Sequence, residues 1–174
     1  MNELSWHVLF VKGGKEELVK EQINKFEGVH AFLPRVVKMF RRNGKLNKEE
    51  MLLFKNYVFI QTALDFTEFM ALLQINIKPI QGFLKVLQHK DNQIETLYPH
   101  EKDFLIKFTN DDYVLQESIG LIENDKIIIT EGPLKGHESM IKKIDRHKRT
   151  ALISLSMFGL DQDVVVGLEI VKKI

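Results

Sequence analysis

The residues best suited to chemistry in this sequence are basic side chains gathered between positions 135 and 149. Eight lysines, arginines and histidines lie there: Lys135, His137, Lys142, Lys143, Arg146, His147, Lys148 and Arg149. Only Glu138 and Asp145 oppose them locally. Several long cations on one surface attract the phosphate backbone of a nucleic acid. We therefore expect an RNA-binding surface here, with a merely solvated turn as the alternative.

A second basic tract surrounds an Asn43-Gly44 pair. Its cations include Arg41, Arg42 and Lys45, but Glu49 and Glu50 follow them and dilute the positive charge. Attraction to phosphates depends on uncompensated charge. A contact with DNA is therefore one reading of this tract, and a solvated hairpin tip is the other.

Residue patterns of an enzyme do not occur in the sequence. It has no glycine-rich phosphate loop, no nucleophile elbow and no pair of catalytic carboxylates, and Gly13-Gly14 is typical of a turn. The six histidines show no metal-ligand spacing and have no cysteines beside them. We expect a protein that is not an enzyme and that uses no cofactor and no metal.

The composition predicts a globular protein. The chain has 174 residues, 44% of them hydrophobic, a formal net charge of +1 and no cysteine. No apolar stretch approaches the roughly 20 residues that a membrane helix needs. The absence of cysteine fits a reducing compartment. We expect a cytoplasmic, monomeric protein without membrane contact.

The first half of the chain predicts one α/β unit. Residues 6–11 and 57–61 have the aromatic and β-branched composition of strands, the second of them central. Apolar spacing predicts a helix over 15–26, and Asp65 with Glu68 predicts a capping box for a helix that buries Phe66, Phe69, Met70 and Leu73. A strand region over 30–42 leads into the Asn43-Gly44 turn, which is typical of a hairpin, and returns through 52–54 by a disordered or bulged tip. Residues 83–86 complete the set of strands.

The second half changes to an all-β pattern. Pro99 opens a short helix that ends near Phe108, and the polar stretch 109–120 indicates a linker. Short strands follow at 126–130, 138–144, 150–157, 163–166 and 169–171. Such short strands favour a small closed barrel, because closure removes exposed strand edges. We expect an N-terminal domain over 1–108 and a C-terminal domain over 121–174.

Several segments together resemble a known family. The segment 131–136, with Gly132 and Gly136 at its turns, followed by the basic strand 141–145, resembles the KOW motif. The opening 6–10, the aromatic strand 53–60 and the Ser156-Met157-Phe158-Gly159 segment resemble parts of NusG-type transcription elongation factors, in the same order along nearly the whole chain. The resemblance implies an α+β protein: an N-terminal NGN α/β sandwich and a five-stranded, SH3-like KOW β-barrel.

Within that family the sequence looks most like the LoaP antiterminators. The short linker, the turn 145–149 and the closing segment 166–171 carry this likeness. Lys55-Asn56 also stands where general NusG proteins usually have Pro-Gly, which weighs against a general factor.

The resemblance implies roles for residues that composition alone does not distinguish. In the family an apolar depression receives the clamp helices of bacterial RNA polymerase, and the corresponding residues here are Trp6, Phe10, Phe54 and Tyr57. Ordinary core packing is the alternative for these four. The hairpin residues Arg41, Arg42 and Lys45 correspond to a contact with upstream DNA, and Phe158 to a contact with a protein partner.

The sequence thus predicts a polymerase-binding antiterminator whose KOW domain binds a structured leader RNA hairpin. Two alternatives stay open: a general NusG-like factor whose KOW domain binds a protein, and a ribosome-associated KOW protein.

Overall fold

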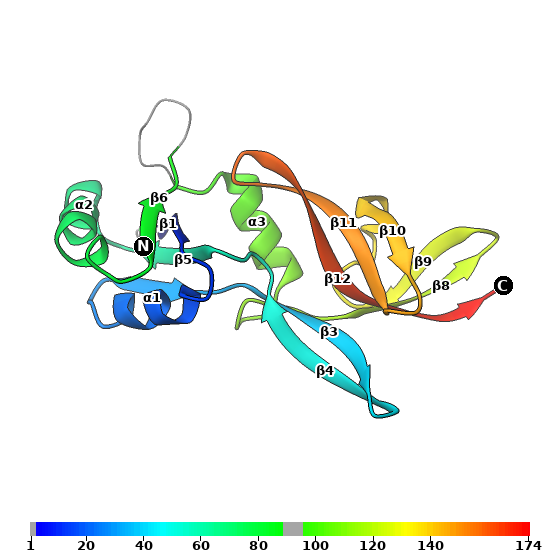
Figure 1. Ribbon diagram of the computed structural model, residues 1–174. Helices are drawn as coiled ribbons and strands as arrows, with labels where there is room; N and C mark the ends of the chain where they lie inside the picture. Colours follow the sequence, from blue (N-terminus) through cyan, green and yellow to red (C-terminus); the bar gives the residue numbers. More distant parts are fainter. Residues whose placement is uncertain (1–2, 89–95) are drawn as a thin grey trace. The chain divides into compact units, whose positions relative to one another are not determined.

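The structure is a computed structural model that describes residues 3–88 and 96–174 (Figure 1). Contacts divide the chain into two units. The first unit contains Met1–Leu33 and Phe54–Lys102, and the second contains Pro34–Leu53 and Asp103–Ile174. The chain therefore leaves the first unit after Leu33, contributes a segment to the second, and returns at Phe54.

The first unit is built on an antiparallel sheet with the strand order β2-β5-β1-β6. Its strands are β1 (Ser5–Val11), β2 (Val29–Phe32), β5 (Tyr57–Thr62) and β6 (Phe83–Val86). The predicted central position of β5 is confirmed, since it pairs with β2 on one side and β1 on the other. Side chains alternate along β1, so Trp6, Val8 and Phe10 share one face of the sheet and His7, Leu9 and Val11 the other.

Helices α1 (Glu16–Ile23) and α2 (Phe66–Leu72) complete the first unit, and α2 continues as a π-helical segment over Leu73–Ile77. The predicted capping box of α2 is confirmed: the N–H of Glu68 donates to Asp65 at 2.9 Å, and the N–H of Asp65 donates back to Glu68 at 2.9 Å. The predicted burial of Phe66 is wrong, because it lies in the first turn of α2 and is 64% exposed, whereas Phe69 and Leu73 are buried. Helix α1 is shorter than predicted and is followed by Asn24, whose side chain hydrogen-bonds the backbone of Ala31.

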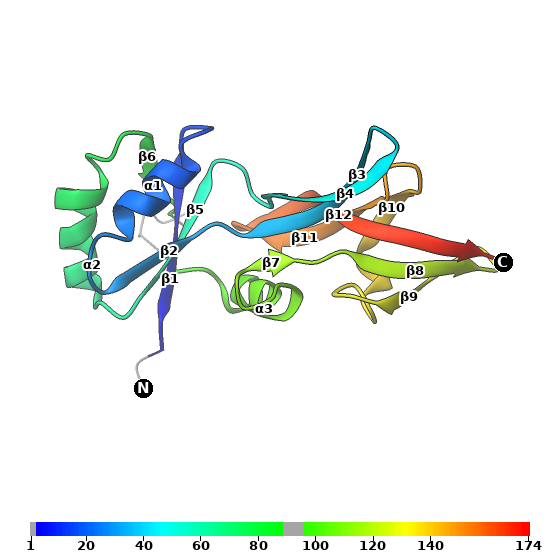
Figure 2. The same ribbon diagram turned by 90° about the horizontal axis from the view of Figure 1, so that it is seen from below.

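The second unit contains a sheet with the strand order β10-β11-β12-β8-β9. Its strands are β8 (Ser118–Glu123), β9 (Lys126–Glu131), β10 (Ile141–Asp145), β11 (Thr150–Met157) and β12 (Leu160–Lys173), with a short 3₁₀ helix at Glu138–Met140. Strand β12 pairs antiparallel with β11 and then parallel with β8 (Figure 2). It is one long strand where two were predicted, because pairing continues through Gly167 opposite Thr150. The α+β class is confirmed, and closure of this sheet into an SH3-like barrel stays a prediction.

The remaining strands of the second unit form a hairpin with a short partner strand. Strands β3 (Arg35–Arg42) and β4 (Lys45–Leu52) pair in regular register up to Arg42 and Lys45, and β3 also pairs with β7 (Val114–Leu115). The turn is the predicted type, with positive φ at Asn43 (50°) and Gly44 (74°). Its tip is a regular two-residue turn, so the prediction of a disordered or bulged tip is wrong.

The segments before and after this hairpin can be compared with the prediction. The predicted strand region 30–42 divides into β2 and β3, and Pro34, which lacks an N–H donor, lies at the break. Helix α3 (Pro99–Phe108) agrees with the prediction. The stretch 109–120, read as a linker, contains β7 and the first residues of β8, with Leu115 and Ser118 buried. The domain limits 1–108 and 121–174 stay a prediction.

Candidate nucleic-acid and protein interfaces

The most basic turn of the second unit connects β10 to β11 through residues 146–149. The carboxylate of Asp145 closes this turn by accepting a hydrogen bond from the N–H of Lys148 at 2.9 Å. That N–H holds the pKa of Asp145 below its ordinary value, with the charge of Lys148 helping. Arg149 takes a left-handed conformation (φ 52°), and its carbonyl accepts a hydrogen bond from the N–H of Leu168 at 3.0 Å. The turn is therefore held to β12 by its backbone, which leaves its cationic side chains to project.

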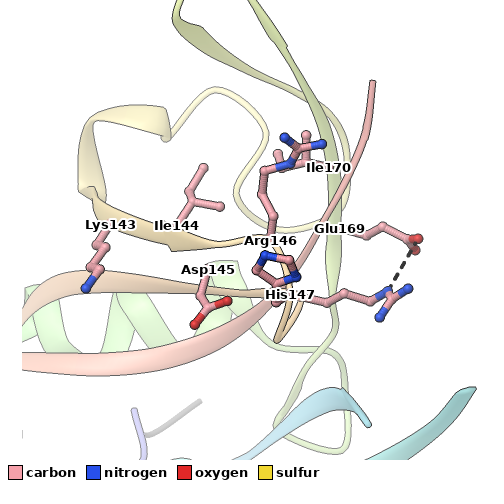
Figure 3. Close-up of a pocket in the computed structure, with 8 residues that line it drawn as sticks. Lys143, Ile144, Asp145, Arg146, His147, Glu169 and Ile170 are labelled. Atoms are coloured by element: carbon pink, nitrogen blue, oxygen red, sulfur yellow. Dashed lines mark ion pairs between the residues drawn. The ribbon is translucent and has the colours of Figure 1, made fainter. Parts of the chain in front are cut away.

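These cationic side chains border a depression of about 540 Å³ (Figure 3). Strand β12 contributes Glu169 and Ile170 to its wall, and Nε of Arg149 lies 3.7 Å from Oε1 of Glu169. The complete lining is Lys143, Ile144, Asp145, Arg146, His147, Arg149, Glu169 and Ile170. Among the described residues no acid forms an ion pair with Lys143 or Arg146, so their positive charges are available to an anion.

The structure brings together half of the predicted RNA-binding residues. Lys143, Arg146, His147 and Arg149 line the depression. Lys148 is exposed beside it, with Nζ 3.9 Å from Asp145. Lys142 instead forms an ion pair with Asp163 at 2.7 Å. Lys135 and His137 belong to another turn, where the ring of His137 lies 4.7 Å from that of Phe108.

That other turn contains the Gly132 and Gly136 pair and is packed against the start of β8. Gly132 has a φ of 93°, and a Cβ there would lie 2.6 Å from the carbonyl oxygen of Glu117. The N–H of Leu134 donates to Oγ of Ser118 at 3.1 Å, and both residues are fully buried. A side chain at position 132 would push this turn away from β8, which explains the glycine.

The four aromatic residues predicted to bind the polymerase separate into two pairs. Phe10 and Tyr57 are opposite one another in the β1–β5 register, half-buried, with ring centroids 5.4 Å apart. Nζ of Lys85, from β6, lies 5.8 Å from the Phe10 ring. Trp6 and Phe54 are buried, at 6% and 5% exposure. Of these four residues, it is therefore Phe10 and Tyr57 that offer aromatic surface to a partner.

A tight turn before β5 positions Tyr57. Asn56 has a φ of 70°, a left-handed conformation that asparagine tolerates better than most residues. Its N–H donates to Oε1 of the buried Glu16 at 2.9 Å, and its carbonyl accepts the N–H of Val11 at 2.8 Å. Asn56 thus supports a left-handed turn that would otherwise favour glycine.

The basic hairpin tip is only partly compensated. Arg41, Arg42 and Lys45 are all exposed, and Arg42 forms an ion pair with Glu49 at 3.0 Å. Within the described residues neither Arg41 nor Lys45 has an acidic partner. These two side chains are the ones that a nucleic acid could neutralise.

The predicted protein-contact residue lies in the turn between β11 and β12. Phe158 is half-buried with a φ of 60°, and Leu160, two residues later, is 66% exposed. Both apolar side chains of this turn are at least partly exposed.

Sequence reasoning did not identify several neighbours of these sites. Lys85 could have been found from the alternation of the strand over 83–86, since it pairs with Phe10. Glu169 and Ile170 could not, because only long-range strand pairing brings them to the turn. Among residues 3–88 and 96–174, no group of three histidine, aspartate or glutamate side chains is arranged to hold a metal ion. No helix in those two ranges has the length and apolar character needed to span a membrane.

Comparisons with known proteins identify the fold. A family model described as "Transcription termination factor nusG" matches residues 4–103. Seventeen chains of solved structures match, among them one titled "Domain interaction in Thermotoga maritima NusG". It is 17% identical, covers 95% of this chain and 94% of that chain, and superposes with a TM-score of 0.50, which supports the fold alone. No curated protein matches the sequence.

Proposed function

Because the chain belongs to the NusG family, we propose that it binds bacterial RNA polymerase and promotes processive antitermination, recruited by a structured leader RNA. The family match over 4–103 supports the polymerase part, and the basic depression at the β10–β11 turn supports the RNA part. No covalent chemistry is needed. A factor that binds the elongating polymerase more tightly than the paused one shifts the population toward elongation. It would act as a monomer in the cytoplasm.

The Phe10–Tyr57 pair is the proposed contact with the polymerase clamp helices. Buried aromatic anchors carry much of the free energy of protein interfaces. The two rings are held in place by strand pairing and are still half exposed, so little ordering is required on binding. Trp6 and Phe54 would support this surface from within the core.

The depression at the β10–β11 turn is the proposed RNA contact, and it is the observation that carries the antitermination proposal. Lys143 and Arg146 offer uncompensated charge to phosphates, and His147 beside them can stack on or hydrogen-bond an unpaired base. A-form RNA hides its base edges in a deep groove, so loop bases of a hairpin are the readable ones. Selection of a leader would therefore come from hairpin shape and loop contacts.

Two measurements test this proposal. In transcription with purified polymerase, addition of the protein should increase readthrough of a terminator on templates that encode the leader hairpin upstream, and templates with a scrambled leader should show no increase. Equal readthrough on both templates would show that RNA recruitment is not the mechanism.

Binding to purified polymerase tests the docking surface separately. The Phe10→Ala/Tyr57→Ala variant should bind more weakly by about 2–4 kcal/mol, since two anchors are lost. Phe66→Ala is the matched control, because Phe66 is an exposed aromatic of the same unit. Equal losses in both variants would remove the docking role from Phe10 and Tyr57.

The half-buried Phe158 and the exposed Leu160 support a second candidate, a general NusG-like factor whose C-terminal domain binds a protein. Apolar side chains at a turn suit a protein contact better than a contact with a phosphate backbone. If Phe158→Ala abolished the effect on transcription and substitution of Arg146 did not, this candidate would replace the RNA proposal. A ribosome-associated role has no comparable support from the described surfaces.

The domain limits 1–108 and 121–174, joined by 109–120, are part of the proposal. For Arg41, Arg42 and Lys45, contact with upstream DNA is one candidate role of the hairpin tip and contact with RNA is the other, and titration with each nucleic acid distinguishes them.

A further inference from the structure

We infer that the β3–β4 hairpin and the β10–β11 turn form one continuous binding surface for the phosphates of a double-helical RNA. This inference rests on the RNA part of the proposed function and extends it. The basic tip of the hairpin would bind the same RNA stem as the depression.

The hairpin is packed directly on the strands that carry the basic turn. A Cβ at Gly167 of β12 would lie 2.6 Å from the carbonyl oxygen of Val37 in β3, so no side chain separates the two backbones there. Strands β3 and β12 are in contact, and Figure 1 shows the hairpin leaving β12 toward its tip. The absence of a side chain at position 167 is thus the feature that permits this close approach.

An ion pair across the same junction fixes the orientation of the hairpin. Lys48 of β4 donates to the carboxylate of Glu117, which is largely buried. Burial raises the pKa of Glu117, but the hydrogen bond and charge of Lys48 lower it more, so the carboxylate is ionised at neutral pH. Strand β7 pairs with the edge of β3 opposite β4 and adds backbone hydrogen bonds to the hairpin.

The point of contact adjoins the basic turn. Gly167 pairs with Thr150, the residue directly after Arg149, and the next residue, Leu168, donates to the carbonyl of Arg149. Lys48 is opposite Met39, and Arg41 follows two positions after Met39, so Arg41 projects from the same hairpin face as Lys48. Because Lys48 reaches Glu117, this face is turned toward the C-terminal strands.

The uncompensated charges are found at both ends of the proposed surface. Within the described parts of the chain, Arg41 is uncompensated on this hairpin face, and Lys143 and Arg146 are uncompensated at the depression. Lys45 pairs with Arg42 and projects from the opposite hairpin face. Cations held apart on one packed body suit a partner whose phosphates are rigidly spaced, as in a duplex. Arg42, already paired with Glu49, would contribute less.

Fluorescence anisotropy with the full-length protein tests the inference. The probe is a labelled, fully paired RNA hairpin, titrated at several salt concentrations, with duplex DNA of the same stem length in parallel. The Arg41→Ala variant should raise the Kd for RNA several-fold and lower the salt slope by about one, whereas Lys45→Ala, on the opposite face of the hairpin, should change both much less. Lys143→Ala/Arg146→Ala should raise the Kd on the order of tenfold and lower the slope by about two. Lys12→Ala/Lys78→Ala, which removes two exposed lysines of the first unit, is the matched control and should change neither quantity.

A further variant tests the docking itself. Gly167→Ala should displace the hairpin, so adding Arg41→Ala in that background should weaken RNA binding much less than it does in the wild type. Glu117→Gln, which weakens the Lys48 anchor without a change in backbone, provides the same comparison if Gly167→Ala fails to fold by circular dichroism. Full additivity in both backgrounds would overturn the shared surface.

The outcomes separate this inference from the proposed function. If the Arg41→Ala variant matched the lysine control while Lys143→Ala/Arg146→Ala weakened RNA binding, the shared surface would be wrong and RNA recognition would stand. If the wild type bound no RNA, both would fail. A hairpin variant that weakened only DNA binding would assign the hairpin to DNA and overturn the inference.

Discussion

Acidification should destabilise the first unit through one residue, His7. It is 5% exposed in β1, its ring stacks on Phe69 of α2 with centroids 4.0 Å apart, and its Nδ1 has no hydrogen-bond partner among the described residues. Burial lowers the pKa of His7 from 6.5 to about 4. The folded protein therefore holds this imidazole neutral, whereas the unfolded chain takes up a proton below pH 6.5.

The sign and size of the effect follow from this difference. Since the folded pKa is depressed, the stability is fully present above about pH 6.5 and is lost as the pH falls toward 4. Each pKa unit corresponds to about 1.4 kcal/mol, so the loss amounts to about 3 kcal/mol near pH 4, of which about 2 kcal/mol is already lost at pH 5. A loss of that size is a large fraction of the stability of a small domain.

The assay compares wild type with His7→Leu in urea denaturation at pH 7, 6 and 5. Trp6 is the single tryptophan and neighbours His7, so its fluorescence reports on this unit. The variant keeps a side chain of similar volume and removes the titrating group, so it should lose about 2 kcal/mol less than wild type between pH 7 and 5. The lowered pKa values of Glu117, Glu138 and Asp145 affect both proteins equally. Parallel pH profiles for the two proteins would refute the role given to His7.

Other consequences of the structure can be measured directly. Phe54→Ala should lower the free energy of unfolding by about 3–5 kcal/mol, because the ring is buried and its centroid lies 5.8 Å from that of Phe59; an unchanged urea midpoint would show that Phe54 is not part of the core. Gly132→Ala should destabilise the second unit by at least about 1 kcal/mol, since φ at this position is positive and the added Cβ would meet the backbone of β8; a smaller loss measured by calorimetry would contradict that packing. The isolated segment 118–174, which keeps the whole of β8, should fold alone and give a dispersed NMR spectrum; a collapsed spectrum would show that it needs the strands outside it.

The sequence alone determined the features that depend on neighbouring residues. The capping box of Asp65, the Asn43-Gly44 turn and the strand at 57–62 rest on backbone hydrogen bonds and torsions of a few consecutive positions, and all are found in the structure. The glycine at position 132 was also read correctly as a turn requirement. Patterns of this kind are local, so they can be recognised without knowledge of the fold.

Only the tertiary structure decided which members of a pattern are exposed. Trp6 and Phe10 share one face of β1, and the period of two cannot distinguish them, yet Trp6 is in the core and Phe10 is half-buried. Strand β7, within 109–120, forms because β3 lies beside it and pairs with it. The polar composition of 109–120 did not predict this strand.

The grouping of the basic residues was decided in the same way. The sequence placed Lys142 and Lys143 together, but Asp163 of β12 pairs with Lys142, and Lys143 lines the depression. The packing of the hairpin on β12 brings Val37 against Gly167, which are more than a hundred positions apart. The largely buried carboxylate of Glu117 adds an ion pair with Lys48 of the hairpin. Such contacts depend on the free energy of burying distant surfaces together, which no local window of the sequence contains.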